Sequence, residues 1–160
     1  MIGWLLGAAL AGAAEPDPAR GAVLAGLGLC EACHTAPGGA PYAGGYRVET
    51  NFGDWVGPNL TPDWATGLGA WELEDFVTAM RYGRSPAGRA YAPSFPYAWF
   101  TALSDEELAD LWAYLRQVPA VARENEPHDV PGRYRWRASI AAWRLLYFDA
   151  GPAPAGEDPL

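Results

Sequence analysis

The stretch Cys30-Glu31-Ala32-Cys33-His34 decides how the rest of this chain is read, because it has the pattern C-x-x-C-H. This pattern attaches a haem group covalently to a polypeptide. The two thiols add to the two vinyl groups on one edge of the porphyrin, and a single helical turn places both thiols on that edge. The adjacent imidazole then projects under the ring to the iron, which accepts a proximal His. We therefore expect one covalent haem c, bound by Cys30 and Cys33 and ligated by His34.

Three other readings of the two cysteines compete with haem attachment. A structural zinc ion takes four ligands, but the chain has no third Cys and only one further His, His128. A thioredoxin-like redox pair needs a βαβ context and a helix N-terminus that lowers the thiol pKa, and the flanking sequence indicates neither. A plain disulfide gives no role to the adjacent His34. Both cysteines and one of the two histidines fall within five residues, which favours haem.

The composition suits a single globular domain with one core, since the chain has 160 residues and half of them are hydrophobic. Its 19 Gly and 15 Pro indicate long ordered loops between a few helices rather than a regular sheet. The formal net charge is −8, and no basic stripe is evident, so nucleic acid is not an expected partner. A protein partner that charge steers to this chain should present positive patches.

The first 14 residues form an apolar run that ends in small residues. Ala11-Gly12-Ala13 fits the A-x-A pattern of a signal-peptide cleavage site, and the run is shorter than the about 20 residues that cross a bilayer. No Lys or Arg precedes it, so a retained weak anchor and a buried N-terminal helix are the alternatives. We expect a periplasmic protein whose membrane association, if any, is made through a partner or an uncleaved N-terminus.

Four helices are expected, at residues 18–28, 71–82, 104–118 and 137–148. Asp17 resembles an N-cap followed by Pro at the first helical position. Ser104 and Glu107 form a capping box, and Gly83 is placed to end the second helix. The expected apolar stripes are Val23, Leu24 and Leu27; Leu73, Phe76, Val77 and Met80; Leu108, Leu111, Trp112 and Leu115; and Ile140, Trp143, Leu146 and Tyr147.

Between these helices the chain reads as loop, most of all over residues 35–69. A loop of that length is uncommon in a compact domain unless it is functional, and wrapping the edge of a haem supplies a function. We expect a haem-binding domain over residues 15–120, an extension that packs on it over 121–150, and a disordered Pro- and Gly-rich tail over 151–160.

These features resemble those of a class I cytochrome c, with one helix before C-x-x-C-H, loops, and a capped helix carrying Leu-Trp-Ala-Tyr-Leu. The resemblance implies an all-α fold in which a few helices and long loops wrap one covalently bound haem, and in which the first and last core helices cross. Gly57-Pro58-Asn59-Leu60 is similar to the segment whose proline carbonyl accepts the proximal imidazole N–H. Such a bond orients the ring and raises its basicity, so Pro58 is an expected part of the site.

A narrower resemblance is to the cytochrome c subunits of bacterial membrane dehydrogenases for alcohols, gluconate and similar substrates. It covers about residues 21–152 and is carried by CEACHTAPGG, YAGG, PNLTPDWATGLGAWELEDF, SFPYAWFTALSDEELADLWAYL and WRLLYF. Those subunits usually carry three such domains, whereas this chain has one haem motif and resembles a single domain of them.

The sixth iron ligand is less evident than the fifth. Many relatives place the distal Met in a P-x-M-P-Y segment, and here Phe95 occupies the Met position. Met80 is the only Met beyond residue 1, and the resemblance places its helix on the distal side of the haem. Met80 is the expected ligand; a core role for Met80, an open or water-bound iron, and ligation by His128 are the alternatives.

Other aromatic and basic side chains are candidates for contact with the haem or its propionates. Tyr97 is included in the expected haem-binding set, and Trp71, Trp55 and Arg47 are weaker candidates. An Arg can donate charged hydrogen bonds to a propionate, although each of these residues could equally have a structural role.

The function that these features imply is one-electron transfer, in which the chain is a carrier rather than an enzyme. Its expected redox partners are a dehydrogenase as donor and an oxidase or another cytochrome as acceptor. The first alternative is a haem enzyme or gas-binding protein with an exchangeable sixth iron position, which the loss of Met at position 95 motivates. A binding module without haem is the third hypothesis.

Overall fold

A computed structural model describes residues 15–151 of the chain. The expected leader at 1–14 and all of the expected tail but its first residue therefore lie outside the described residues. The elements are α1 (Pro18–Leu27), α2 (Cys30–His34), β1 (Arg47–Val48), β2 (Trp55–Val56), α3 (Leu73–Tyr82), α4 (Tyr97–Phe100), α5 (Asp105–Leu115), α6 (Gly132–Arg135) and α7 (Arg137–Tyr147). Within the described range, no helix combines the length and the apolar character that a bilayer crossing requires.

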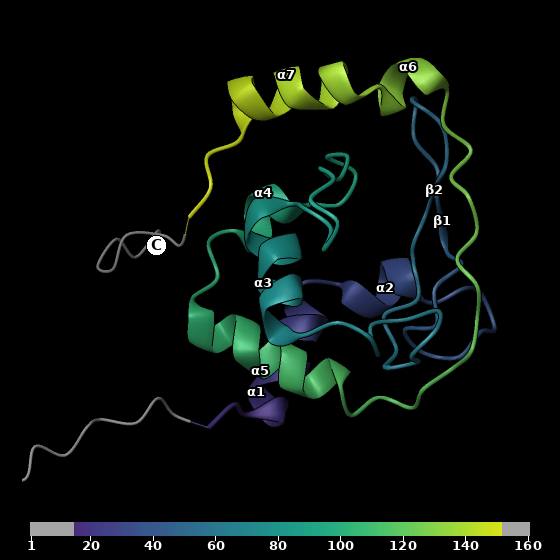
Figure 1. The fold of residues 1–160 in the computed structure, drawn as a ribbon. Coiled ribbons are helices and arrows are strands. Elements are labelled where there is room, and N and C mark those ends of the chain that lie inside the picture. Colours follow the sequence, from purple (N-terminus) through teal and green to yellow (C-terminus); the bar gives the residue numbers. More distant parts are fainter. Residues whose placement is uncertain (1–14, 152–160) are drawn as a thin grey trace, which may run out of the picture.

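Helices α1 and α5 cross at the base of the molecule as Figure 1 draws it, and they form the most extensive helix contact. The contact depends on small residues, because Gly21 and Ala25 are the buried positions of α1. A Cβ on Gly21 would overlap the backbone carbonyl of Asp110. The expected stripe of α1 is therefore wrong in part: Val23 and Leu27 are 62% and 77% exposed, since close backbone approach turns the small residues inward.

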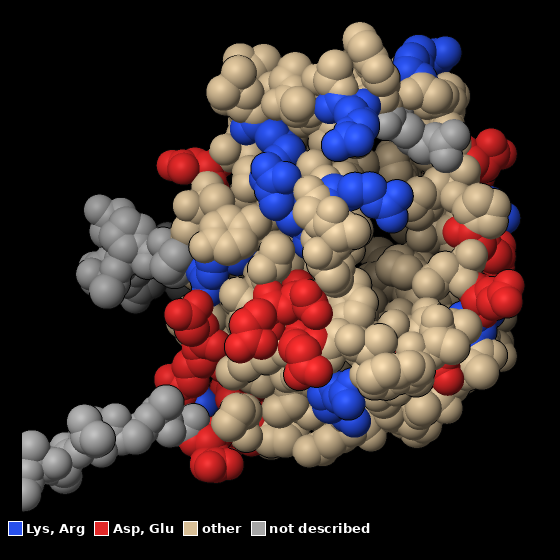
Figure 2. All heavy atoms as spheres, in the orientation of Figure 1, with Lys and Arg blue, Asp and Glu red and all other residues tan. Residues whose placement is uncertain are grey.

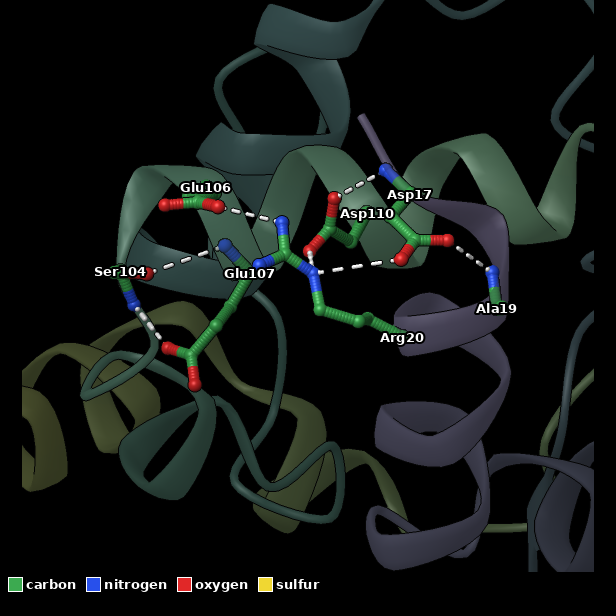
Figure 3. Close-up of polar contacts among 7 residues, drawn as sticks. All are labelled: Asp17, Ala19, Arg20, Ser104, Glu106, Glu107 and Asp110. Atoms are coloured by element: carbon green, nitrogen blue, oxygen red, sulfur yellow. Dashed lines mark hydrogen bonds and ion pairs between the residues drawn. The ribbon is translucent and has the colours of Figure 1, made fainter. Parts of the chain in front are cut away.

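A polar cluster holds the starts of α1 and α5 together (Figure 3). The carboxylate of Asp110 is only 1% exposed; it accepts a hydrogen bond from the backbone N–H of Asp17 at 2.6 Å and lies 2.9 Å from Nε of Arg20. Arg20 also bonds Glu106 at 2.5 Å. The buried carboxylate is thus satisfied by a backbone donor and a cation, which a buried charge requires.

The caps at the helix starts agree with the sequence. The side chain of Asp17 accepts from the backbone N–H of Ala19, and Ser104 forms the expected capping box with Glu107. Helix α5 ends at Leu115, three residues earlier than expected. Its continuation to residue 118 was wrong because Pro119 disfavours helical backbone at the residue before it.

Helix α3 lies in the centre of Figure 1 and contributes most of its apolar face to the core. Its expected stripe is confirmed, because Phe76 and Met80 are buried and Leu73 and Val77 are half-buried. Gly83 ends the helix in the left-handed region at φ 56°, as expected. The core that α3 shares with the crossing helices consists of Ala25, Tyr42, Leu68, Phe76, Met80, Leu108, Leu111 and Leu115.

The long loop over 35–69 contains a small hairpin that the sequence did not indicate. Strands β1 and β2 pair antiparallel, with Arg47 opposite Val56 and Val48 opposite Trp55. Two residues a strand are too few for an alternating pattern to be visible in the sequence. The hairpin matters for function because β2 runs directly into Pro58.

After α5 the chain returns along the side of the hairpin toward α6 (Figure 1). Asn59 anchors this return: its Nδ2 donates to the carbonyl of Val121 at 2.8 Å, and its backbone N–H donates to Oδ1 of Asn125 at 2.7 Å. Asn59 is 2% exposed, so these bonds are protected from water. The segment that follows residue 120 is therefore attached to the loop that carries Pro58.

Helices α6 and α7 lie across the top of the molecule in Figure 1. The expected stripe of α7 is wrong in part, because Ile140 and Trp143 are half-buried whereas Leu146 and Tyr147 are 69% and 70% exposed. The helix contacts the rest of the chain along a narrow face, so only one of its sides is covered. Trp143 makes that contact edge-on to the ring of Tyr97, at 6.1 Å between centroids.

Candidate haem site

The C-x-x-C-H stretch forms the short helix α2, one turn that follows α1 directly. Leu29 joins the two helices in the left-handed region, at φ 53°. Because the first and fourth residues of one turn share a face, Cys30 and Cys33 lie on the same side of α2. This is the arrangement that two thioether bonds to one porphyrin edge require.

The two cysteines are free thiols in different surroundings: Cys30 is half-buried against the core and Cys33 is exposed. Burial raises the pKa of Cys30 to about 11, and the neighbouring Cys33 raises it further. A reactive redox thiol has a lowered pKa, so this site differs from that of a thioredoxin-like pair. Among the described residues, no three His, Cys, Asp or Glu side chains come together as a metal ion would require.

The imidazole of His34 is oriented by the backbone of a distant segment. Its Nδ1–H donates to the carbonyl oxygen of Pro58 at 2.8 Å, which leaves Nε2 as the atom available to iron. Burial lowers the pKa of His34, and the bond to Pro58 partly opposes that shift. The ring therefore favours its neutral form, which is the form that ligates a metal. The expectation for Pro58 thus has a geometric basis in the structure.

Two glycines allow this segment to lie so close to α2. A Cβ on Gly57 would overlap the carbonyl oxygen of Cys33. Gly44, at φ 78°, donates its backbone N–H to the carbonyl of His34 at 2.7 Å, and a Cβ there would lie 2.7 Å from the backbone N of Asn59. The sequence alone did not assign these two glycines a role, although Gly57 belongs to the segment that carries the family resemblance.

Met80 and Phe95 both belong to the apolar cluster around α3. Met80 is 5% exposed and lies among the core residues of that cluster, and the half-buried Phe95 packs against it. The ring of Phe95 contacts Tyr91, Tyr97 and Phe100. Phe95 thus fills its position as an apolar residue, and ligation by Met80 stays a prediction.

His128 lies beside the hairpin, on the side of the proximal segment. Its Nδ1 accepts a hydrogen bond from the backbone N–H of Val56 at 3.1 Å, and its ring packs against Trp55 with 4.9 Å between centroids. Val56 precedes Pro58 by two residues, so His128 is attached to the strand that carries the proximal contact. This location does not favour distal ligation by His128.

The remaining candidates fall into different environments. Tyr97 is fully buried, and its hydroxyl has no hydrogen-bond partner within residues 15–151. Trp71 is half-buried against the core. Trp55 lines a cavity between the hairpin and α7. Arg47 bonds Glu126 at 3.2 Å and lies on the face of the hairpin opposite to Trp55, so the structure gives it a carboxylate partner within the chain.

The residues present fit a haem. Two unpaired thiols lie on one face of a single turn, and an imidazole with a free Nε2 follows them. Figure 2 shows that the front face of the molecule is hollowed near its centre, with apolar and uncharged side chains around the hollow. These residues would bind the haem through Cys30 and Cys33 and its iron through His34.

Comparison with known sequences agrees with this geometry. The sequence model of the cytochrome c family matches residues 18–119, which include α1, the haem motif and α5. The chain belongs to the cytochrome c family. Membership implies a covalent haem c and supports the all-α class I fold that the helices and long loops of this cytochrome display.

The curated relatives of this cytochrome are longer proteins. A "Diheme cytochrome c-type" of Cereibacter sphaeroides is 38% identical over 81% of this chain and 46% of its own length. The "Gluconate 2-dehydrogenase cytochrome c subunit" of Pantoea cypripedii is 37% identical over 88% and 33%, respectively. The "Alcohol dehydrogenase (quinone), cytochrome c subunit" of Gluconobacter oxydans is 35% identical over 91% and 33%. This cytochrome thus spans less than half the length of each of these relatives.

Proposed function

We propose that this cytochrome carries single electrons through one covalently bound haem c. The observation that carries the proposal is the pair formed by the Cys30–His34 turn and the carbonyl of Pro58, which presents two thiols and an oriented imidazole. Membership of the cytochrome c family supports electron transfer rather than catalysis. A bound haem supplies an iron that accepts and releases one electron.

The polypeptide contributes attachment, orientation and exclusion of water. Cys30 and Cys33 bind one edge of the ring, which fixes its position relative to α1. The carbonyl of Pro58 holds the His34 ring in one orientation and one tautomer. The apolar cluster around α3 keeps water from the distal side, which favours the reduced, less charged iron and raises the potential.

Met80 is the proposed sixth ligand, on the basis that it is the single thioether in residues 15–160. It shares its cluster with Phe95, the residue at the position where relatives carry a Met. A thioether and an imidazole as the two axial ligands would keep the iron six-coordinate in both redox states, which keeps structural change on electron transfer small.

The donor is proposed to be a membrane dehydrogenase, and the acceptor an oxidase or another cytochrome. The names of the relatives support this, since three of them are cytochrome subunits of gluconate, alcohol and fructose dehydrogenases. A dehydrogenase that delivers electrons outside the cytoplasm requires an exported carrier, so we place this cytochrome in the periplasm, after removal or retention of residues 1–14.

The function is tested by spectroelectrochemistry on the purified, haem-loaded chain, with carbon monoxide added to the reduced form. Electron transfer predicts one reversible one-electron wave, a low-spin reduced spectrum and slow or absent CO binding. Fast CO binding by a high-spin reduced form would instead support an exchangeable sixth position and contradict the carrier function.

The donor is tested on membranes of the source organism, with and without the gene for this cytochrome. Ethanol, gluconate, fructose and nicotinate are added in turn, and haem reduction is recorded. At least one substrate should reduce the wild-type cytochrome in seconds. If dithionite reduces the haem and none of the four substrates does, the dehydrogenase assignment is wrong.

A further inference from the structure

A cavity of about 460 Å³ lies between the hairpin, the loop before α4 and the last two helices. Its walls come from parts of the chain that are distant in sequence, and part of the lining lies beyond residues 18–119, which the family model matches. The lining consists of Thr50, Phe52, Trp55, Ala92, Pro93, Ser94, Tyr134, Ser139, Ile140 and Trp143.

The lining is rich in hydrogen-bond donors that the protein does not use. Ser94 and Tyr134 carry hydroxyls, and Trp55 and Trp143 carry indole N–H groups; none of the four forms a side-chain hydrogen bond within residues 15–151. The other two hydroxyls, of Thr50 and Ser139, donate to backbone carbonyls. Polar groups in half-buried positions are usually paired, so four unused donors around one cavity indicate an acceptor from outside the polypeptide.

The charge around the cavity is positive, although the chain as a whole is acidic. No lining residue is acidic, and residues 83–96 and 131–148 together contain no Asp or Glu and six Arg: Arg84, Arg89, Arg133, Arg135, Arg137 and Arg144. Figure 2 shows Arg side chains gathered above the hollow of the front face, while acidic side chains gather below it and at its edges. An anionic ligand fits such surroundings.

The position of the cavity relative to the haem turn specifies which anion. Strand β2 begins in the cavity at Trp55 and reaches Pro58, against the proximal imidazole, three residues later, a span of about 10 Å in extended backbone. Ser94, on the opposite wall, precedes Phe95, which belongs to the distal cluster. The cavity therefore continues the space between the proximal and distal walls.

The chemistry of the porphyrin orients its carboxylates along this direction. Its two propionates lie on the edge opposite the two vinyl groups, and the vinyl edge is held by Cys30 and Cys33, next to α1. The propionates of a haem attached there therefore point away from α1. In Figure 1, α7 lies at the opposite end of the molecule from α1.

We propose that this cavity binds the two haem propionates, and that α6 and α7 complete the haem site from outside the family domain. The inference rests on the proposed function, because it requires the haem that the motif would attach. Tyr134 and Trp143 supply donors from the C-terminal side, and Trp55 and Ser94 supply them from the hairpin and the distal loop. The neighbouring arginines lower the cost of holding two carboxylates near the iron.

The test uses the full-length haem-loaded chain and the variants Tyr134→Phe and Trp55→Phe, each of which removes one donor. Matched controls are Tyr147→Phe and Trp99→Phe, which make the same changes at exposed positions outside the cavity. The midpoint potential is measured from pH 4 to pH 9, together with the redox-induced infrared difference spectrum of the carboxylates. Haem content and far-UV circular dichroism report folding of each variant.

The cavity variants should lower the midpoint potential, because an uncompensated propionate charge stabilises Fe(III). They should also move the pH-dependent step of the potential upward by about half a unit or more, since fewer donors stabilise the carboxylate. The carboxylate infrared bands should shift in the same variants, and both controls should match the wild type. Ser94→Ala, on an exposed loop, provides the same test if the aromatic variants do not fold.

Cavity variants that load haem and match the wild type in potential, pH profile and infrared bands would overturn the inference. This outcome differs from a failure of the proposed function, in which the wild-type chain itself would contain no reducible haem.

Discussion

The Nδ1 atom of His34 lies 2.8 Å from the carbonyl oxygen of Pro58, 24 residues later in the chain. Between them the chain forms a loop and a hairpin, and Gly57 then passes so close to Cys33 that a side chain has no room. The orientation of the proximal imidazole thus depends on a residue that is not a ligand and has no side chain.

Gly57→Ala should displace the Pro58 carbonyl and lengthen or break its bond to His34. Loss of that bond makes the imidazole a weaker electron donor, so the midpoint potential should rise. The control is Gly132→Ala, because a Cβ at Gly132 meets nothing within 4 Å. The potentials of both variants, measured at pH 7, decide: equal potentials in both variants and the wild type would show that Pro58 does not influence the iron.

The crossing of α1 and α5 yields a second matched pair. Gly21→Ala places a Cβ into the carbonyl of Asp110 and should lower the free energy of unfolding by about 1–3 kcal/mol. Gly26→Ala, on the same helix, meets nothing within 4 Å and should raise it by roughly 0.5–1 kcal/mol. Denaturant unfolding of the haem-loaded chains provides both values. A Gly21→Ala chain as stable as the wild type would argue against the close crossing.

Met80 can be tested without confusing ligation with packing. Met80→Leu preserves most of the side-chain volume and should cost less than about 1.5 kcal/mol as a core change. If Met80 ligates iron, this variant should still lose the weak far-red Met–iron band of the oxidised protein and gain rapid CO binding when reduced. Val77→Ala, one turn earlier on α3, should retain the band.

The double variant Met80→Leu with Phe95→Met extends this test. A thioether at position 95 should restore the band if the distal wall presents that position to the iron. A wild-type chain that lacks the band, with a spectrum unchanged by Met80→Leu, would make Met80 a core residue only.

The docking of α7 depends on few side chains. Trp143→Ala removes its edge-on contact with Tyr97 and should increase amide hydrogen exchange of α7 at least tenfold, because little else covers that helix. Leu145→Ala, at a position that is 86% exposed, should leave the exchange unchanged. Equal protection in both variants would show that α7 is held by other contacts.

The features that a sequence states locally were the ones that could be predicted. The haem motif, the cap at Ser104 and the left-handed end of α3 at Gly83 depend on neighbouring residues, and each is found where it was expected. The buried faces of α1 and α7 were predicted less well. Hydrophobicity indicated Leu27 and Leu146 as buried, whereas close backbone approach at Gly21 and a single covering layer over α7 leave both leucines exposed.

The candidate site divides in the same way. Cys30, Cys33 and His34 are adjacent in sequence, and Pro58 was accessible through a family resemblance. The donors of the cavity come from four separate segments, and nothing near Tyr134 or Ser94 in the sequence indicates that they share it. The positive charge around them was hidden by a net charge of −8, because the acidic residues lie elsewhere in the chain.

Covalent attachment itself is the central claim, and intact mass spectrometry of the chain tests it most directly. The chain is produced in cells that attach haem c, and Cys30→Ala and Cys33→Ala serve as controls. The account predicts the mass of the polypeptide plus one haem, a pyridine haemochrome spectrum of c type, and no free thiol; each control should lose one thioether bond. A colourless chain with the mass of the polypeptide alone and two thiols that react with iodoacetamide would contradict it.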